Sequence, residues 1–167
     1  MMMMTMIMKR RAALLSLLAL SACGFELRKE PELQFRTVGL TGFSRHSAME
    51  AELRRQLSRT SVQVLDDPNR AQVVIEAERD AREKVVVVPT SAGQVREWEL
   101  RLHLDYVLRR PDGEVLLPRT ELTITREMTY TETQALAKEQ EEAQLYRAMQ
   151  SDAIHQVLRR LSVLKVD

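Results

Sequence analysis

The chain is poor in cysteine, aromatic residues and glycine, and it has almost no net charge. It has one cysteine in 167 residues, so no intramolecular disulfide can form. Aromatic residues make up 4% and there are five glycines, which argues against a β-barrel or a repeat protein. The net charge is +1, from 25 basic and 24 acidic residues, so nothing marks a nucleic-acid binder. There is no internal repeat, and no glycine-rich phosphate loop.

The single cysteine, Cys23, closes an apolar run. A cationic block, Lys9 to Arg11, precedes the uncharged, Ala- and Leu-rich residues 12–20. This is the order of a secretory signal peptide, and the run is shorter than the ~20 residues that span a bilayer. The residues Leu20, Ser21, Ala22 and Cys23 resemble the bacterial lipobox. We therefore predict a lipoprotein signal peptide over 1–22 and lipidation of Cys23. An ordinary cleaved signal with an incidental cysteine, or a retained membrane anchor, remain as alternatives.

The residues after Cys23 bear on localisation and domain limits. Residue 24 is Gly rather than Asp, which favours an anchor in the outer membrane facing the periplasm. The charged segment 23–33 contains Pro31 and is predicted to be a lipidated tether. Residues 34–167 are then a single domain. The three basic residues leave with the signal, so the mature chain has 25 − 3 = 22 basic against 24 acidic residues, or −2.

Hydrophobic periodicity predicts an α+β two-layer sandwich. Apolar residues at a spacing of four predict a helix over 47–59, and Ser47 followed by Glu50 fits a capping box. A second, long helix is predicted over 131–164. Strands are predicted over 34–40, 71–89, 96–108 and 115–130, and the segment 61–65 favours at most a brief strand. The order is β, α, β, β, β, α, with both helices covering one face of the sheet.

The segment 96–108 has the clearest pattern. Trp98, Leu100, Leu102, Leu104, Tyr106 and Leu108 alternate with Glu97, Glu99, Arg101, His103 and Asp105. This period of two predicts a strand with one buried face and one face in water. A Pro-Asp-Gly turn follows, and Pro118 in the next strand suits a sheet edge or a bulge.

Nothing in the chain predicts catalysis. The three histidines are His46, His103 and His155, and none stands at metal-ligand spacing from another histidine, a cysteine or a carboxylate in a known motif. No G-x-S-x-G elbow is present. We predict that the protein is not an enzyme and uses no cofactor or metal. Trp98 is predicted to be a core residue rather than a platform for ligand stacking.

Three stretches resemble the LptE family of LPS-assembly lipoproteins from Gram-negative outer membranes. They are the lipobox leading into CGFELR, the strand after GQVREWEL, and QALAKEQEEAQLYRAMQSDAIHQVLRRL. The resemblance implies two helices packed on a mixed four-stranded sheet. It also implies a protein that plugs and helps to assemble the LptD β-barrel, in a one-to-one complex, and binds lipopolysaccharide in transit.

The same resemblance suggests which residues contact lipopolysaccharide. The family's ALAK matches residues 135–138, which makes Lys138 the first expected contact. A second basic residue of the family stands where this chain has Ser91, and Arg96, just past the turn, is the expected substitute. The competing interpretation of Lys138 is a solvated lysine at a helix start. Competing functions are an independent periplasm-facing ligand-binding or carrier lipoprotein and an envelope hydrolase.

Overall fold

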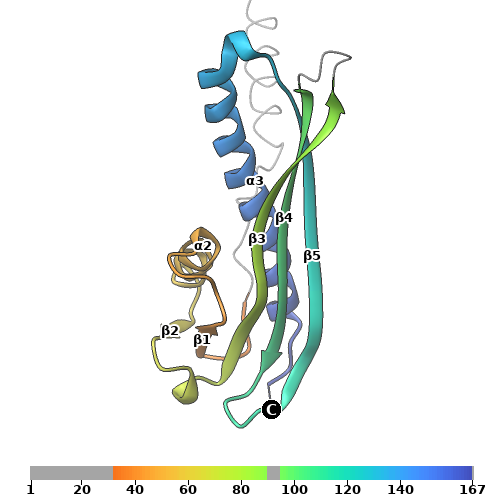
Figure 1. Cartoon of the computed structure of the whole chain (residues 1–167). Coiled ribbons are helices and arrows are strands. Elements are labelled where there is room, and N and C mark those ends of the chain that lie inside the picture. Colours follow the sequence, from red (N-terminus) through yellow and green to blue (C-terminus); the bar gives the residue numbers. More distant parts are fainter. Residues whose placement is uncertain (1–31, 90–94, 167) are drawn as a thin grey trace, which may run out of the picture.

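The protein is built of two layers, a mixed sheet and two helices (Figure 1). The computed structural model describes residues 32–89 and 95–166. The strands lie in the order β2-β1-β3-β4-β5. The apolar side chains of the helices and of one sheet face meet in a single core. The α+β sandwich predicted from periodicity is confirmed.

The sheet has five strands, so the expectation of four was wrong. The additional strand is β2 (Gln63–Leu65), which lies within the segment 61–65. It pairs in parallel with β1 (Thr37–Thr41), which in turn pairs in parallel with β3. A three-residue strand is too short to show alternation, and its hydrogen bonds to β1 are what define it.

Helix α2 (Ala48–Leu57) is close to its predicted limits. The Ser47 hydroxyl accepts a hydrogen bond from the Glu50 amide at 3.0 Å, as an N-cap does. Met49, Leu53 and Leu57 are buried, as the spacing of four predicts. The Ser47 hydroxyl also donates to the Asp80 carboxylate of β3 at 2.5 Å, which fixes the start of the helix against the middle of the sheet.

Three long antiparallel strands run the length of the molecule (Figure 1). They are β3 (Val73–Pro89), β4 (Val95–Arg109) and β5 (Val115–Thr129). Strand β3 pairs with β1 only from Val73 to Glu76. Beyond Glu76, the outer edge of β3 has no strand partner within residues 32–89 and 95–166, and neither has the outer edge of β5. Pro118 therefore lies on an edge strand, as predicted.

Helix α3 (Ala135–Ser162) follows a single 3-10 turn, Glu132–Gln134. The second half of the helix is buried against the sheet and α2, through Met149, Ala153, Ile154, Val157, Leu158 and Leu161. In the first half most side chains are exposed, and the first buried one is Tyr146. None of the described helices combines the length and the apolar character that crossing a bilayer requires.

The sheet face opposite the helices is polar, but two of its residues are not in water as predicted. His103 is 8% exposed and Asp105 is 4% exposed. Both lie on β4, the middle one of the three long strands, where side chains from β3 and β5 cover them. Arg119 on β5 contacts Asp105 at 2.8 Å and reaches Glu78 on β3 at 2.9 Å. The burial of a polar residue here depends on the neighbouring strands and not on its own alternation.

Candidate ligand-binding site at the distal end of the sheet

The distal end of the molecule is the end where β3 finishes, β4 begins, and β5 leads into α3. Lys138 lies there on the second turn of α3, with its side chain only 14% exposed. Its ammonium donates to the Thr129 hydroxyl at 3.2 Å and to the Glu141 carboxylate at 2.8 Å. Lys138 is therefore held between β5 and its own helix, which does not fit a freely solvated side chain.

Arg96 lies at the same end, exposed near the start of β4. Its carbonyl accepts a hydrogen bond from the Tyr130 amide at 2.8 Å. With Thr129 and Tyr130 it lines a cavity of about 430 Å³. Thr129 also accepts the hydrogen bond from Lys138, so the structure brings both expected contact residues to one place. The other two residues of interest, Ser91 and Cys23, lie outside the described residues.

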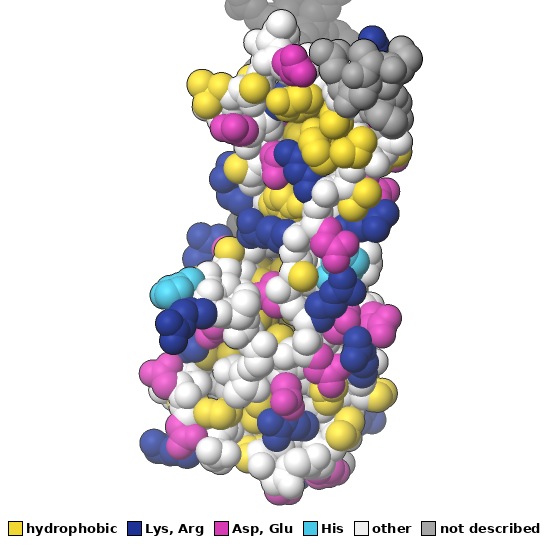
Figure 2. Space-filling view, in the orientation of Figure 1, with side chains coloured by type: hydrophobic (Ala, Val, Ile, Leu, Met, Phe, Trp, Pro, Cys, Tyr) yellow, Lys and Arg dark blue, Asp and Glu magenta, His cyan; other side chains and the backbone are white. Residues whose placement is uncertain are grey.

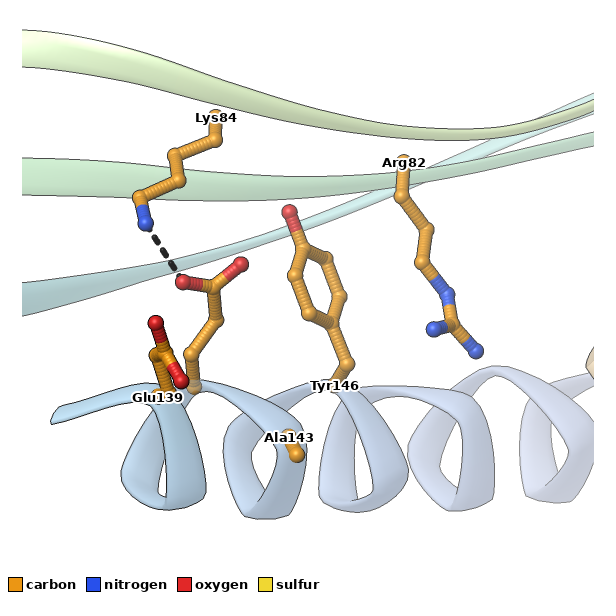
Figure 3. Close-up of a pocket in the computed structure, with 6 residues that line it drawn as sticks. Arg82, Lys84, Glu139, Ala143 and Tyr146 are labelled. Atoms are coloured by element: carbon orange, nitrogen blue, oxygen red, sulfur yellow. Dashed lines mark hydrogen bonds and ion pairs between the residues drawn. The ribbon is translucent and has the colours of Figure 1, made fainter. Parts of the chain in front are cut away.

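A second cavity, of about 480 Å³, opens between β3 and α3 at the distal end (Figure 3). Arg82 and Lys84 reach it from β3, and Tyr146 and Glu142 reach it from α3. The Lys84 ammonium lies 2.5 Å from the Glu142 carboxylate and 4.6 Å from the centre of the Trp98 ring. Sequence analysis did not find these two cations, although their spacing of two residues places them on one face of a strand.

Tyr146 closes the inner wall of this second cavity. Its hydroxyl donates to the Glu83 carbonyl at 2.7 Å, which ties α3 to β3. The Arg82 guanidinium lies 5.1 Å from the centre of its ring and also donates to the Gln150 side chain at 2.8 Å. Burial, with the nearby Glu142 carboxylate, raises the pKa of Tyr146 above its ordinary value, so its hydroxyl stays a donor at neutral pH.

Apolar side chains lie beside these cations. Val86 is 41% exposed, Val87 is 47% exposed and Leu136 is 71% exposed. Figure 2 shows hydrophobic side chains gathered over the upper part of the molecule, with lysine and arginine side chains among them. Cations next to exposed apolar surface suit a ligand that is both anionic and apolar, because one part of it pairs with charge and the other leaves water.

Trp98 belongs to the distal end without being fully buried. Its ring meets the Tyr130 ring edge to face, with centroids 6.5 Å apart, and Lys84 lies over it. The histidines are far from forming a common site: His46 is exposed before α2 with a φ of 60°, His103 is on β4 and His155 is on α3. In the part of the chain that the structure describes, no three His, Cys, Asp or Glu residues are placed to hold a metal ion.

Comparison with known proteins agrees with this architecture. The model of the family described as "LptE: Lipopolysaccharide-assembly" matches residues 35–161. The LPS-assembly lipoprotein LptE of Photorhabdus laumondii is 24% identical over 149 residues, covering 88% of this chain and 81% of that protein. The solution structure of an uncharacterised lipoprotein B from Nitrosomonas europaea is 31% identical, with a TM-score of 0.70, covering 83% of this chain and 90% of the other.

Two crystal structures show the same fold at lower identity. A minor lipoprotein from Acinetobacter baumannii is 22% identical with a TM-score of 0.64, covering 78% of this chain and 92% of that one. The rare lipoprotein B from Shewanella oneidensis is 21% identical with a TM-score of 0.63, covering 76% and 94%. Since the family model spans most of the domain, this chain belongs to the LptE family of lipopolysaccharide-assembly lipoproteins.

Proposed function

We propose that this protein is an outer-membrane lipoprotein that plugs and helps to assemble the LptD β-barrel and binds lipopolysaccharide on its way to the cell surface. The observation that carries the ligand part is at the distal end. Lys138 donates a hydrogen bond to Thr129, Thr129 and Arg96 line one cavity, and Leu136 is exposed on the same turn of α3 as Lys138. The family's role in lipopolysaccharide assembly supports the rest.

The chemistry of the distal end matches that of lipid A, which is anionic and acylated. Hydrogen bonds to charged groups are shorter and stronger than neutral ones, so an ammonium held in place gives a defined phosphate contact. Lys138 is positioned by Thr129 and Glu141, and exchanging the Glu141 carboxylate for a phosphate oxygen would keep its charge compensated. The exposed apolar side chains nearby would shelter part of an acyl chain.

The shape and surface of the domain support a plug. Three strands of 15 to 17 residues make it long, with a core confined to one side of the sheet (Figure 1). The other side of the sheet carries mostly charged and hydroxyl side chains, with a few small aliphatic residues between them. A barrel lumen is polar, so a plug that fills it needs a polar exterior with its own compact core.

The N-terminal anchor is part of the same proposal. Signal cleavage would leave Cys23 as the first residue, carrying lipid, with residues 23–33 linking it to the domain. Two or more acyl chains give durable membrane attachment, since each buried methylene contributes about 0.8 kcal/mol. The anchor would hold the protein at the periplasmic side of the outer membrane, where the barrel assembles.

Lys138→Asp tests the ligand site. Losing a charge-assisted hydrogen bond costs about 1.5–3 kcal/mol, so the Kd for lipopolysaccharide is expected to rise about tenfold or more. Lys165→Asp makes the same charge change near the C-terminus and is expected to leave the Kd unchanged. Thermal unfolding is measured to check that both variants are folded. Equal affinity of Lys138→Asp and wild type would remove Lys138 from the site.

Affinity purification from detergent-solubilised outer membranes tests the plug. A large β-barrel protein is expected to co-purify with the lipidated protein in a one-to-one ratio. A Cys23→Ser variant is expected to lose membrane attachment, shown by fractionation. If the wild-type protein is recovered without a barrel, the plug hypothesis is rejected in favour of an independent carrier function.

A further inference from the structure

The sheet face opposite the helices, here called the outer sheet face, has a large excess of negative charge. Its acidic residues are Glu76, Glu78 and Glu83 on β3, Glu97, Glu99 and Asp105 on β4, and Glu121 and Glu127 on β5. Its basic residues are Arg79, Arg101, Arg109 and Arg119. The formal charge of the face is 4 − 8 = −4 when histidine is left out of the count, although that of the mature chain as a whole is near −2.

Every arginine on the outer sheet face is already paired within the face. Arg119 contacts Glu78, Asp105 and Glu121 at 2.9, 2.8 and 3.2 Å. Arg79 pairs with Glu83 at 2.7 Å, Arg101 pairs with Glu99, and Arg109 pairs with Glu76. The three carboxylates around Arg119 raise its pKa, against the opposite effect of desolvation, so it stays charged. The negative surplus therefore cannot be neutralised by these arginines.

The surplus is concentrated toward the distal half of the face. Glu99 on β4 stands directly opposite Glu127 on β5, and like charges in that position repel each other. Glu127 is exposed, and neither it nor Glu97 has an ion-pair partner in the ranges that the structure describes. Nearer the other end, Asp105 stands opposite Glu121 in the same way, but there Arg119 bridges the two.

The two opposed carboxylate pairs differ in whether a cation of this chain lies between them, and a partner could supply the missing cation. The opposed pair at Asp105 and Glu121 is stabilised by a guanidinium from the same chain. The opposed pair at Glu99 and Glu127 has only Arg101 beside Glu99. The exposed residues Thr123 and Thr125 lie on the same face. Their short hydroxyl side chains protrude little from the sheet, so another sheet can approach this part of β5 closely.

We propose that the outer sheet face is the docking surface for a basic, polar sheet wall, with arginine or lysine side chains of the partner reaching Glu97, Glu99 and Glu127. The inference rests on the proposed function, and it identifies that wall as the part of the barrel lumen facing this sheet. Charge complementarity of this kind fixes orientation and speeds encounter. The ligand site adjoins this surface at its distal end, because Thr129 is paired directly with Glu97.

The test is co-purification of the barrel with full-length, lipidated variants. Glu127→Lys and Glu97→Lys are each expected to reduce the recovered barrel about fivefold or more, because a like charge replaces an attractive one. Glu139→Lys is the matched control, since Glu139 is an exposed glutamate on α3 whose replacement makes the same charge change on the helix layer. Recovery with wild type is expected to fall with rising salt more steeply than with Glu127→Gln.

A photo-crosslinking residue at Thr125 gives a second measurement that does not depend on affinity. It is expected to link to a segment of the barrel rich in arginine or lysine. If wild type recovers the barrel and both lysine variants recover as much as Glu139→Lys, the docking inference is overturned and the proposed function stands. Crosslinks from Thr125 only to a neutral or acidic segment overturn it as well. If wild type recovers no barrel, the proposed function fails, and the inference fails with it.

Discussion

The first half of α3 is held to the sheet by few contacts, and Tyr146 is the most buried of them. Its side chain is 7% exposed, its hydroxyl donates to the Glu83 carbonyl, and Arg82 lies against its ring. Before it in the helix, Lys138 reaches Thr129 and Glu142 reaches Lys84, both near the surface. We therefore expect this tyrosine to determine whether the distal half of the helix stays docked.

Two substitutions distinguish the contributions of the Tyr146 hydroxyl and the Tyr146 ring to the free energy of unfolding. Tyr146→Phe removes one hydrogen bond and leaves the Glu83 carbonyl without this donor, which costs about 1 kcal/mol of unfolding free energy. Tyr146→Ala also removes the buried ring and its contact with Arg82, for a total cost of about 3–5 kcal/mol. Urea unfolding at pH 7 measures both. Leu136→Ala, at a 71% exposed position on the same helix, is expected to cost less than about 0.5 kcal/mol.

Hydrogen exchange tells whether the loss is local. If α3 detaches while the rest stays folded, amides of residues 136–145 exchange faster in Tyr146→Ala and those of residues 150–161 do not. If Lys138 binds lipopolysaccharide as proposed, the affinity for it is expected to fall as well, because Lys138 is no longer fixed against Thr129. Equal unfolding free energies for the phenylalanine and alanine variants would refute the reasoning, since the ring would then contribute nothing.

Three further predictions concern the fold. Gly42→Ala is expected to cost about 2–5 kcal/mol in urea unfolding, because φ is 77° and a Cβ would lie 2.0 Å from the Ala77 carbonyl oxygen. Ser47→Ala is expected to cost about 1–2 kcal/mol by the same measurement, since the N-cap and the bond to Asp80 are both lost. Burial raises the pKa of Tyr106 above 10, so unfolding free energy is full below pH 10 and falls as pH rises beyond it; Tyr106→Phe is expected to flatten that fall.

Periodicity was enough to predict the elements where one face is buried. The alternation over 96–108 placed β4 within one residue of its observed limits, with Leu100, Leu102 and Leu104 facing the core. The spacing of four placed α2 within two residues of its observed limits. The resemblance of residues 135–138 to the family motif led to Lys138, which the structure places at the same end as Arg96. Whether either residue contacts lipopolysaccharide stays a prediction.

What periodicity could not predict depends on register between strands. Alternation from Val73, Ile75 and Ala77 would place Arg82 and Lys84 on the outer sheet face. The pairing slips by one residue between Ala77 and Arg79, so that Arg82 and Lys84 face α3 instead. A bulge leaves no signal in hydrophobic pattern alone. The hydrophobic pattern also does not predict that Arg119 covers Asp105, because this contact depends on which β5 residue lies beside β4.

The unpaired edges of β3 and β5 have a consequence for self-association of the protein. A long edge with free backbone amides and carbonyls is a template on which a second copy could add its own strand. Pro118 on β5, the bulge at Glu78, and charged side chains such as Arg126 and Lys84 interrupt those edges. These interruptions disfavour strand pairing between two copies of the chain.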